Sequence, residues 1–77
     1  MALVRKMSMV SLERDAPHLE VDCTYSIISV AGSEKFLQID TYGSRKRKMR
    51  GKKSQSIRFS TEALRKIREV IKNEFSD

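Results

Sequence analysis

The chain has 77 residues, with 16 lysines and arginines against 10 aspartates and glutamates, which is the size of one small domain. Its single cysteine excludes an internal disulfide, and one cysteine with one histidine cannot supply the four ligands of a structural zinc site. A chain this short buries only about 60 % of its unfolded surface, so we expect it to gain further stability as a homodimer.

No run of apolar residues approaches the length of a signal sequence or a membrane-spanning helix, so we expect no membrane partner. The unpaired Cys23 fits a reducing compartment. We therefore expect an intracellular, cytoplasmic protein, associated with the nucleoid if the source is bacterial.

Residues 1–19 show no clean hydrophobic period, and we interpret them as an N-terminal tail or an extra strand. Pro17 argues against a helix there, because proline lacks an amide donor and disfavours the helical conformation of the residue before it. Residues 20–77 are predicted to form a single domain of β-sheet plus helix.

Alternation of apolar and polar residues begins at Val21 and predicts the first strand of this domain. The apolar phase shifts at Ile27 and Ile28, which predicts an inserted β-bulge residue. Residues 31–34 have the composition of a turn and lead into a second strand over residues 35–42, so this part predicts a β-hairpin.

Residues 45–53 hold seven of the sixteen cations and no acid, whereas the rest of the chain carries nine cations and ten acids. Such dense like charges repel one another, so we expect this basic run to form a loop or a flexible hairpin tip. Alternation resumes over residues 54–59 and predicts another strand, and Ser60 suits the N-cap of a helix over residues 61–75. The predicted fold is therefore α+β, an antiparallel sheet of three to four strands followed by one C-terminal helix that packs on the sheet.

The strand over residues 35–42 carries Phe36 and Tyr42 on the face opposite Leu37 and Ile39. One helix covers only one face of a sheet, so we expect the face with Phe36 and Tyr42 to be open. Aromatic rings beside a cationic channel are typical of proteins that bind single-stranded nucleic acid. The alternative is that both rings are buried in a dimer interface or a satellite core, and the sequence leaves both interpretations open.

The basic run is interpreted first as a phosphate-binding element, because arginine binds phosphate bidentately and lysine acts as a mobile point charge. A nuclear-localisation-like address and a merely solubilising loop are the alternatives. The predicted nucleic-acid-binding residues are Phe36, Tyr42, Arg45, Lys46, Arg47, Lys48, Arg50, Lys52, Lys53 and Arg58.

Patterns that would indicate catalysis or metal binding are missing. His18 lies among acidic residues, but the spacing matches no metal-ligand motif, so we expect no metal. A lone histidine builds no nucleophile–base constellation, and no glycine-rich phosphate loop occurs, so we expect neither enzymatic activity nor a cofactor. Cys23 shares its alternation with Tyr25 and Ile27, which predicts a core position.

The order of strand, turn, strand, basic loop, strand and helix, with Phe-Leu-Gln-Ile-Asp-Thr-Tyr at 36–42 and Gly-Lys-Lys-Ser-Gln-Ser-Ile-Arg-Phe at 51–59, resembles the positive cofactor four family over about residues 20–75. That family comprises transcriptional coactivators and small bacterial and phage relatives. The resemblance implies a homodimer whose curved sheets and basic loops bind single-stranded or unwound DNA with little sequence preference. By position, Lys52 and Lys53 match the family's basic step, and Tyr42 matches the aromatic residue that closes its second strand.

The functional prediction is a non-catalytic protein that binds single-stranded or unwound DNA with low specificity and acts in the regulation of transcription or replication. RNA is a second compatible ligand. The alternative is a small phage-type inhibitor or interaction module that uses its basic loop against a host protein.

Overall fold

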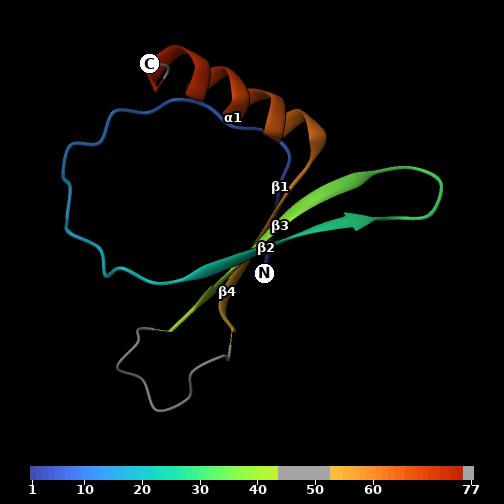
Figure 1. Ribbon diagram of the computed structural model, residues 1–77. Coiled ribbons are helices and arrows are strands. Elements are labelled where there is room, and N and C mark those ends of the chain that lie inside the picture. Colours follow the sequence, from blue (N-terminus) through green and yellow to red (C-terminus); the bar gives the residue numbers. More distant parts are fainter. Residues whose placement is uncertain (44–52, 76–77) are drawn as a thin grey trace.

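The computed structural model describes residues 1–43 and 53–75 and shows an α+β fold (Figure 1). Its elements in chain order are β1 (Ala2–Val4), β2 (Cys23–Ser29), β3 (Lys35–Tyr42), β4 (Lys53–Phe59) and α1 (Thr61–Glu74). The mostly antiparallel sheet followed by one C-terminal helix confirms the predicted fold class. The strand predicted over residues 35–42 begins and ends at the same residues in the structure.

The four strands lie in the order β1-β4-β3-β2. β3 pairs antiparallel with both β2 and β4, whereas β1 pairs parallel with the outer side of β4. The sheet is therefore mixed, and the expectation of a wholly antiparallel sheet is wrong in this respect. Parallel pairing needs a long connection, which the chain between β1 and β4 supplies. The Ser60 amide donates to the Val4 carbonyl at 3.0 Å and extends this contact beyond β4.

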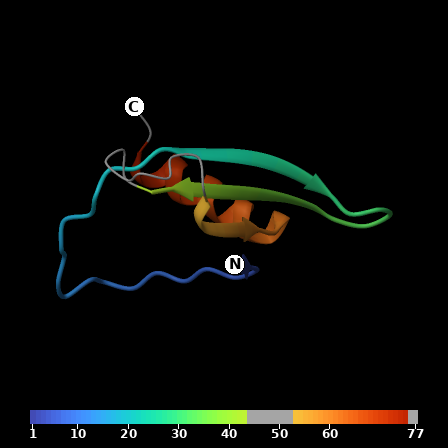
Figure 2. The same ribbon diagram turned by 90° about the horizontal axis from the view of Figure 1, so that it is seen from below.

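Residues 5–22 connect β1 to β2 without forming a helix or a strand, and they are exposed. This segment arcs away from the sheet before the chain enters β2 (Figures 1 and 2). Arg5 at its start forms an ion pair with Glu34, with Nη1 and Oε2 3.1 Å apart. β1 and this exposed ion pair hold the start of the segment near the sheet, and at its other end the Tyr42 amide donates to the Asp22 carbonyl at 3.1 Å.

A tight turn joins β2 to β3. The Val30 amide donates to the Glu34 carbonyl at 2.9 Å, and Gly32 adopts a φ of +80°, a conformation that glycine reaches without a side-chain clash. Pairing between β2 and β3 continues from Cys23 to Ser29 without a register shift, so the bulge predicted at Ile27 and Ile28 is wrong. The apolar phase shifts there because each face of the sheet receives one isoleucine, not because a residue is inserted.

A register shift does occur at the other end of the sheet, between Thr41 and Tyr42. Thr41 lies opposite Gln55 while Tyr42 lies opposite Lys53, so Ser54 is the extra residue of β4. A bulge of this kind bends the strand and increases its local twist. Tyr42 and Lys53 therefore face each other at the ends of β3 and β4 that flank residues 44–52.

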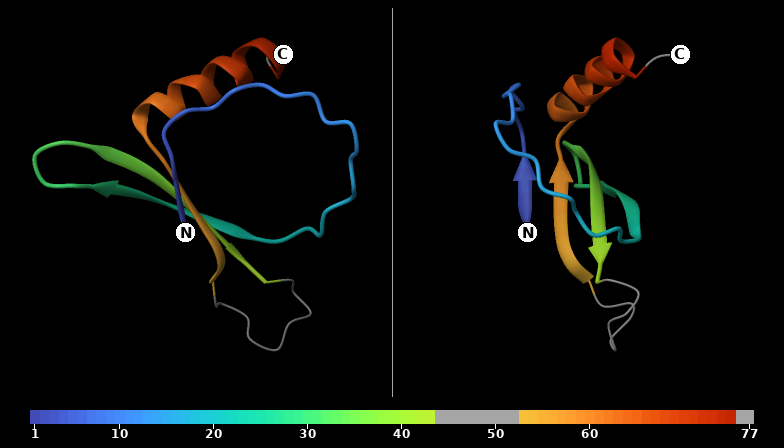
Figure 3. Two further views of the ribbon diagram at one scale, coloured as in Figure 1. Left: turned by 180° about the vertical axis from the view of Figure 1, so that it is seen from behind. Right: turned by 90° about the vertical axis from the view of Figure 1, so that its left-hand side faces the viewer.

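α1 begins where β4 ends. The Ser60 Oγ accepts a hydrogen bond from the Ala63 amide at 3.2 Å, which confirms the predicted N-cap. Ala63 is fully buried at the start of the helix, which contacts β3 and β4. The helix then extends past the end of the sheet (Figures 1 and 3), and Ile71 and Phe75 remain 53 % and 71 % exposed. The predicted packing of the helix on the sheet therefore holds only for its first part, because the direction of β4 carries the rest of the helix off the sheet.

The two faces of the sheet differ in chemistry. On one face, called here the apolar face, two cross-strand rows run from β1 to β2: Ala2, Ile57, Ile39 and Tyr25, and Val4, Phe59, Leu37 and Ile27. On the other, called the polar face, the rows contain Leu3, Arg58, Gln38 and Ser26, then Ser56, Asp40 and Thr24, with Phe36 opposite Ile28. Tyr42 also belongs to the polar face, because its hydroxyl meets that of Thr24 at 3.0 Å.

Burial in the single chain is the reverse of what this chemistry suggests. On the polar face of β3, Phe36, Gln38 and Asp40 are only 7 %, 9 % and 3 % exposed. Leu37 and Ile39, which point to the apolar face of the same strand, are half-buried. The side chains of the polar face pack against one another, whereas the apolar face has little cover.

Edge strand β2 shows the same lack of cover. Tyr25 and Ile27 on its apolar side are 75 % and 61 % exposed. Cys23 shares their face and is also exposed, so its predicted core position is wrong. The predicted alternation of these residues along the strand is confirmed, but the helix that was expected to cover them does not lie over them.

Candidate functional site

Asp40 is the centre of a hydrogen-bonded network on the polar face. Its carboxylate is almost completely buried and accepts hydrogen bonds from the Ser56 hydroxyl and from Gln38 Nε2, the latter at 3.1 and 3.3 Å. Lys53 Nζ lies 3.3 Å from Oδ2 and completes an ion pair. A buried carboxylate is costly unless it is paired and hydrogen-bonded, and donors from β3 and β4 meet this requirement.

These donors change the acidity of the carboxyl group. The hydrogen bond from Ser56 lowers the pKa of Asp40, burial opposes this effect, and donation from Gln38 and Lys53 lowers the pKa further. Asp40 is therefore ionised at neutral pH, and its charge is what orders the surrounding donors.

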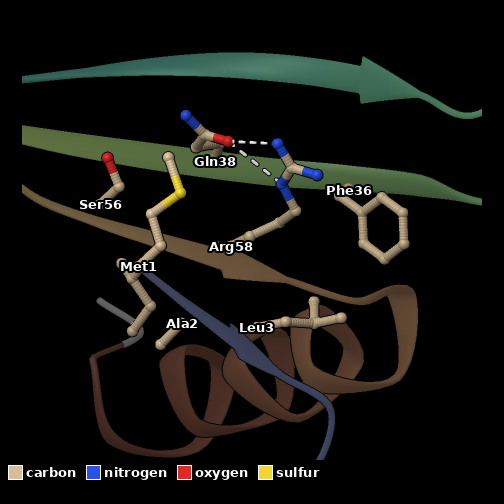
Figure 4. A pocket seen from close by; sticks show the side chains of 8 residues that line it. Met1, Ala2, Leu3, Phe36, Gln38, Ser56 and Arg58 are labelled. Atoms are coloured by element: carbon tan, nitrogen blue, oxygen red, sulfur yellow. Dashed lines mark hydrogen bonds between the residues drawn. The ribbon is translucent and has the colours of Figure 1, made fainter.

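Gln38 transmits this order to Arg58. A carboxylate only accepts and a guanidinium only donates, so the amide of Gln38 must turn its nitrogen to Asp40 and its oxygen to Arg58. The Gln38 Oε1 accepts from Arg58 Nε at 3.1 Å and from Nη2 at 2.6 Å (Figure 4). The network thus runs from Asp40 through Gln38 to the guanidinium and leaves the amide only one orientation.

Arg58 also covers Phe36. Its Cζ lies 5.7 Å from the centroid of the Phe36 ring, within the range of a cation–π contact. The ring is 7 % exposed, so in the single chain a base can stack on it only if Arg58 moves aside. Arg58 itself is half-buried and presents the outer surface at this point of the polar face.

A pocket of about 240 Å³ opens beside Arg58 and is lined by Met1 and by residues of β1, β3 and β4. Met1, Leu3 and Phe36 supply apolar walls, and Gln38, Ser56 and Arg58 supply polar groups (Figure 4). The third guanidinium nitrogen, Nη1, points away from Gln38 towards the side of Phe36. The pocket therefore combines an apolar wall with one oriented cation, as small-ligand sites commonly do.

Of the residues predicted to bind nucleic acid, Phe36, Tyr42, Lys53 and Arg58 lie on or beside the polar face of β3 and β4. Tyr42 is half-buried and Lys53 is exposed. The other predicted residues lie outside the described part of the chain: Arg45, Lys46, Arg47, Lys48, Arg50 and Lys52.

Sequence reasoning missed Gln38, Asp40 and Ser56 as members of this site. The available signal was the strict alternation that puts Gln38 and Asp40 between Phe36 and Tyr42. Their direct partners across the sheet, Arg58 and Ser56, became identifiable only from the pairing register.

Other kinds of site have no support in residues 1–43 and 53–75. No group of three or more potential metal ligands occurs among them. Within the same residues, no helix has the length and apolar character needed to cross a bilayer. No family model, curated protein or solved structure matches the chain.

The lowered pKa of Asp40 predicts a pH dependence of stability. Its ionised form stabilises the folded state at every pH above the unfolded value of about 3.9, and this contribution is lost as the pH falls through the lower folded value. Asp40→Asn keeps the shape but removes the charge, so the stability gap between wild type and this variant should shrink on acidification. Urea unfolding at neutral pH and below about pH 4 measures the gap, and Glu20→Gln removes an exposed carboxylate elsewhere as the control. A gap that is the same at both pH values would contradict the assigned role of the charge.

The different environments of the two aromatic rings predict different effects of truncation. Phe36→Ala removes a buried ring and should cost about 3 to 5 kcal/mol of unfolding free energy. Tyr42→Ala removes a half-buried ring at the end of β3, and if that ring stacks on a base, oligonucleotide binding should weaken by about 1 to 3 kcal/mol. Thermal melts and binding titrations on both variants separate the two effects. Unchanged oligonucleotide binding by a folded Tyr42→Ala protein would remove Tyr42 from the interface.

Proposed function

We propose that this protein binds single-stranded nucleic acid, preferentially DNA, and that it does so without catalysing a reaction. The observation that carries the proposal is the position of the basic run in the chain. It connects the end of β3 at Tyr42 to the start of β4 at Lys53, so the run adjoins the strands that form the polar face. A cationic segment beside a face with an oriented arginine and a half-buried tyrosine fits a bound strand of phosphates and bases.

The two parts have complementary roles in this proposal. The basic run neutralises phosphates, which gives affinity on any sequence, and the polar face contacts bases. The resemblance to the positive cofactor four family supports the same mode of binding. A role in the regulation of transcription or replication follows from that resemblance alone.

We further propose that the functional unit is a homodimer formed through apolar surface that one chain leaves in water. Tyr25 and Ile27 on β2 and Ile71 and Phe75 on α1 are each more than half exposed. Exposed apolar side chains on a sheet edge and on a helix are typical of protein interfaces, and an unpaired edge strand favours association with another strand. Burial of these side chains in a dimer supplies the core that a 77-residue chain lacks.

Nucleic-acid binding predicts a specific dependence on salt. If about four cations of the basic run neutralise phosphates of a single strand, the logarithm of the binding constant should fall against the logarithm of salt concentration with a slope of about −3. Replacing Arg45, Arg47, Lys48 and Lys52 together by glutamine should flatten this slope, and Lys53 is kept because it pairs with Asp40. The matched control replaces the four exposed helix cations Arg65, Lys66, Arg68 and Lys72 and should retain it.

Fluorescence anisotropy with a labelled oligonucleotide measures both slopes. Equal slopes for wild type and the basic-run variant would exclude the run as the phosphate contact. Absence of oligonucleotide binding at low salt would reject the proposed function and favour the protein-binding alternative.

The dimer predicts a sedimentation-equilibrium mass of two chains at micromolar concentration. Ile27→Asp places a charge on the exposed apolar surface of β2 and should shift the mass to that of one chain, because burying an unpaired carboxylate is costly. Met9→Asp places the same charge on a residue of the irregular N-terminal segment that is 90 % exposed, and it should leave the mass unchanged. A wild-type protein that sediments as one chain contradicts the dimer.

A further inference from the structure

The guanidinium of Arg58 is held by one edge and free at another. Arginine has five N–H donors. The Nε–H and one N–H of Nη2 lie on the same edge of the guanidinium and donate to Gln38 Oε1. Among residues 1–43 and 53–75, no hydrogen-bond acceptor contacts Nη1. The edge formed by Nη1 and the second N–H of Nη2 is therefore a preformed fork with two parallel donors.

The network behind Arg58 keeps this fork in place. Gln38 cannot rotate its amide without turning its nitrogen towards a cation and its oxygen towards the Asp40 carboxylate. Asp40 is held in turn by Ser56 and Lys53 from the neighbouring strand. A side chain with this backing loses little conformational freedom when it binds a ligand, which is the usual requirement for specific recognition.

The surroundings of the fork indicate what kind of ligand it meets. The adjacent pocket of about 240 Å³ has accessible apolar side chains from Met1 and Leu3, while the Phe36 ring lies beneath Arg58. An apolar wall suits the flat face of a nucleobase and does not suit a phosphate group, which keeps its hydration. Phosphates have the basic run available instead.

We propose that this pocket holds one unpaired base of the bound strand and that Arg58 reads it with its free fork, Gln38 and Asp40 being positioning residues. The inference rests on the proposed single-strand binding and extends it to base preference. Two parallel donors require two adjacent acceptors on one base edge. Cytosine offers the adjacent acceptors O2 and N3, and guanine offers O6 and N7. In adenine and thymine, no two acceptors are adjacent on one base edge, because a donor separates them or an acceptor stands alone. The pocket therefore prefers both cytosine and guanine to adenine and thymine.

The test compares oligonucleotides of equal length that consist only of deoxycytidine, only of thymidine, or only of abasic sugar-phosphate units. The wild-type protein should bind the cytosine strand about tenfold more tightly than the thymine strand, which is the value of one good bidentate contact, about 1.4 kcal/mol. Arg58→Lys keeps the charge but lacks the fork, so it should reduce this ratio to about one. Its affinity for the abasic strand should stay within about twofold of wild type.

Two further variants test the positioning role of Gln38 and provide a control. Gln38→Leu removes the acceptor that orients Arg58 and should also reduce the cytosine-to-thymine ratio, while the affinity for the abasic strand is retained. Arg65→Lys makes the same chemical change as Arg58→Lys at an exposed helix position and should leave the ratio at its wild-type value. Two-dimensional NMR spectra of each variant show that the fold is intact, and the Arg58 Nε–H signal should shift with cytosine strands and stay in place with abasic ones.

The outcomes separate this inference from the function on which it rests. Equal binding of cytosine and thymine strands with a steep salt dependence would overturn the base pocket and leave single-strand binding in place. A tenfold ratio that survives in Arg58→Lys would overturn the assignment of Arg58. A loss of abasic-strand affinity in Arg58→Lys as large as the loss for cytosine would show that Arg58 contacts phosphate and overturn base reading. Absence of binding to all three strands would reject the proposed function together with the inference.

Discussion

The buried carboxylate of Asp40 is the interaction on which the arrangement of the polar face depends. A charge that is 3 % exposed in so small a domain requires donors on every accessible side. Ser56 lies directly across from it on β4, Gln38 lies two residues away on β3, and Lys53 reaches it from the start of β4. A one-residue slip between β3 and β4 would turn these side chains to the opposite face, so Asp40 favours the observed register.

The same carboxylate determines what the polar face presents to a ligand. Through Gln38 it orients Arg58, and Arg58 in turn covers Phe36. An arginine held in this way acts as a rigid planar donor instead of a mobile surface charge. The aromatic ring therefore acts mainly as support for the guanidinium, and the accessible contact surface of this region is the guanidinium itself.

The position of the helix leaves the apolar face of the sheet with little cover. Because α1 extends past the sheet, two rows of apolar side chains from four strands have little cover within one chain. In the function proposed above, the polar face contacts nucleic acid and the apolar face contacts a second copy of the chain. The bulge at Ser54 lies where β3 and β4 adjoin the basic run, and it brings Tyr42 and Lys53 opposite each other at that end.

Local patterns in the sequence predicted the strands at 35–42 and 54–59, the Ser60 cap, the helix and the alternation of the two sheet faces, because period and capping depend on residues near one another in the chain. The structure begins the second of these strands one residue earlier, at Lys53. The local patterns also placed Phe36, Tyr42, Lys53 and Arg58 among the candidate residues. Only the tertiary structure decided that β1 pairs parallel with β4, that α1 leaves the apolar face uncovered, and that Asp40, Ser56, Gln38 and Arg58 form one network. These features depend on the register between strands and on the direction in which the chain leaves β4, and no short-range pattern contains that information.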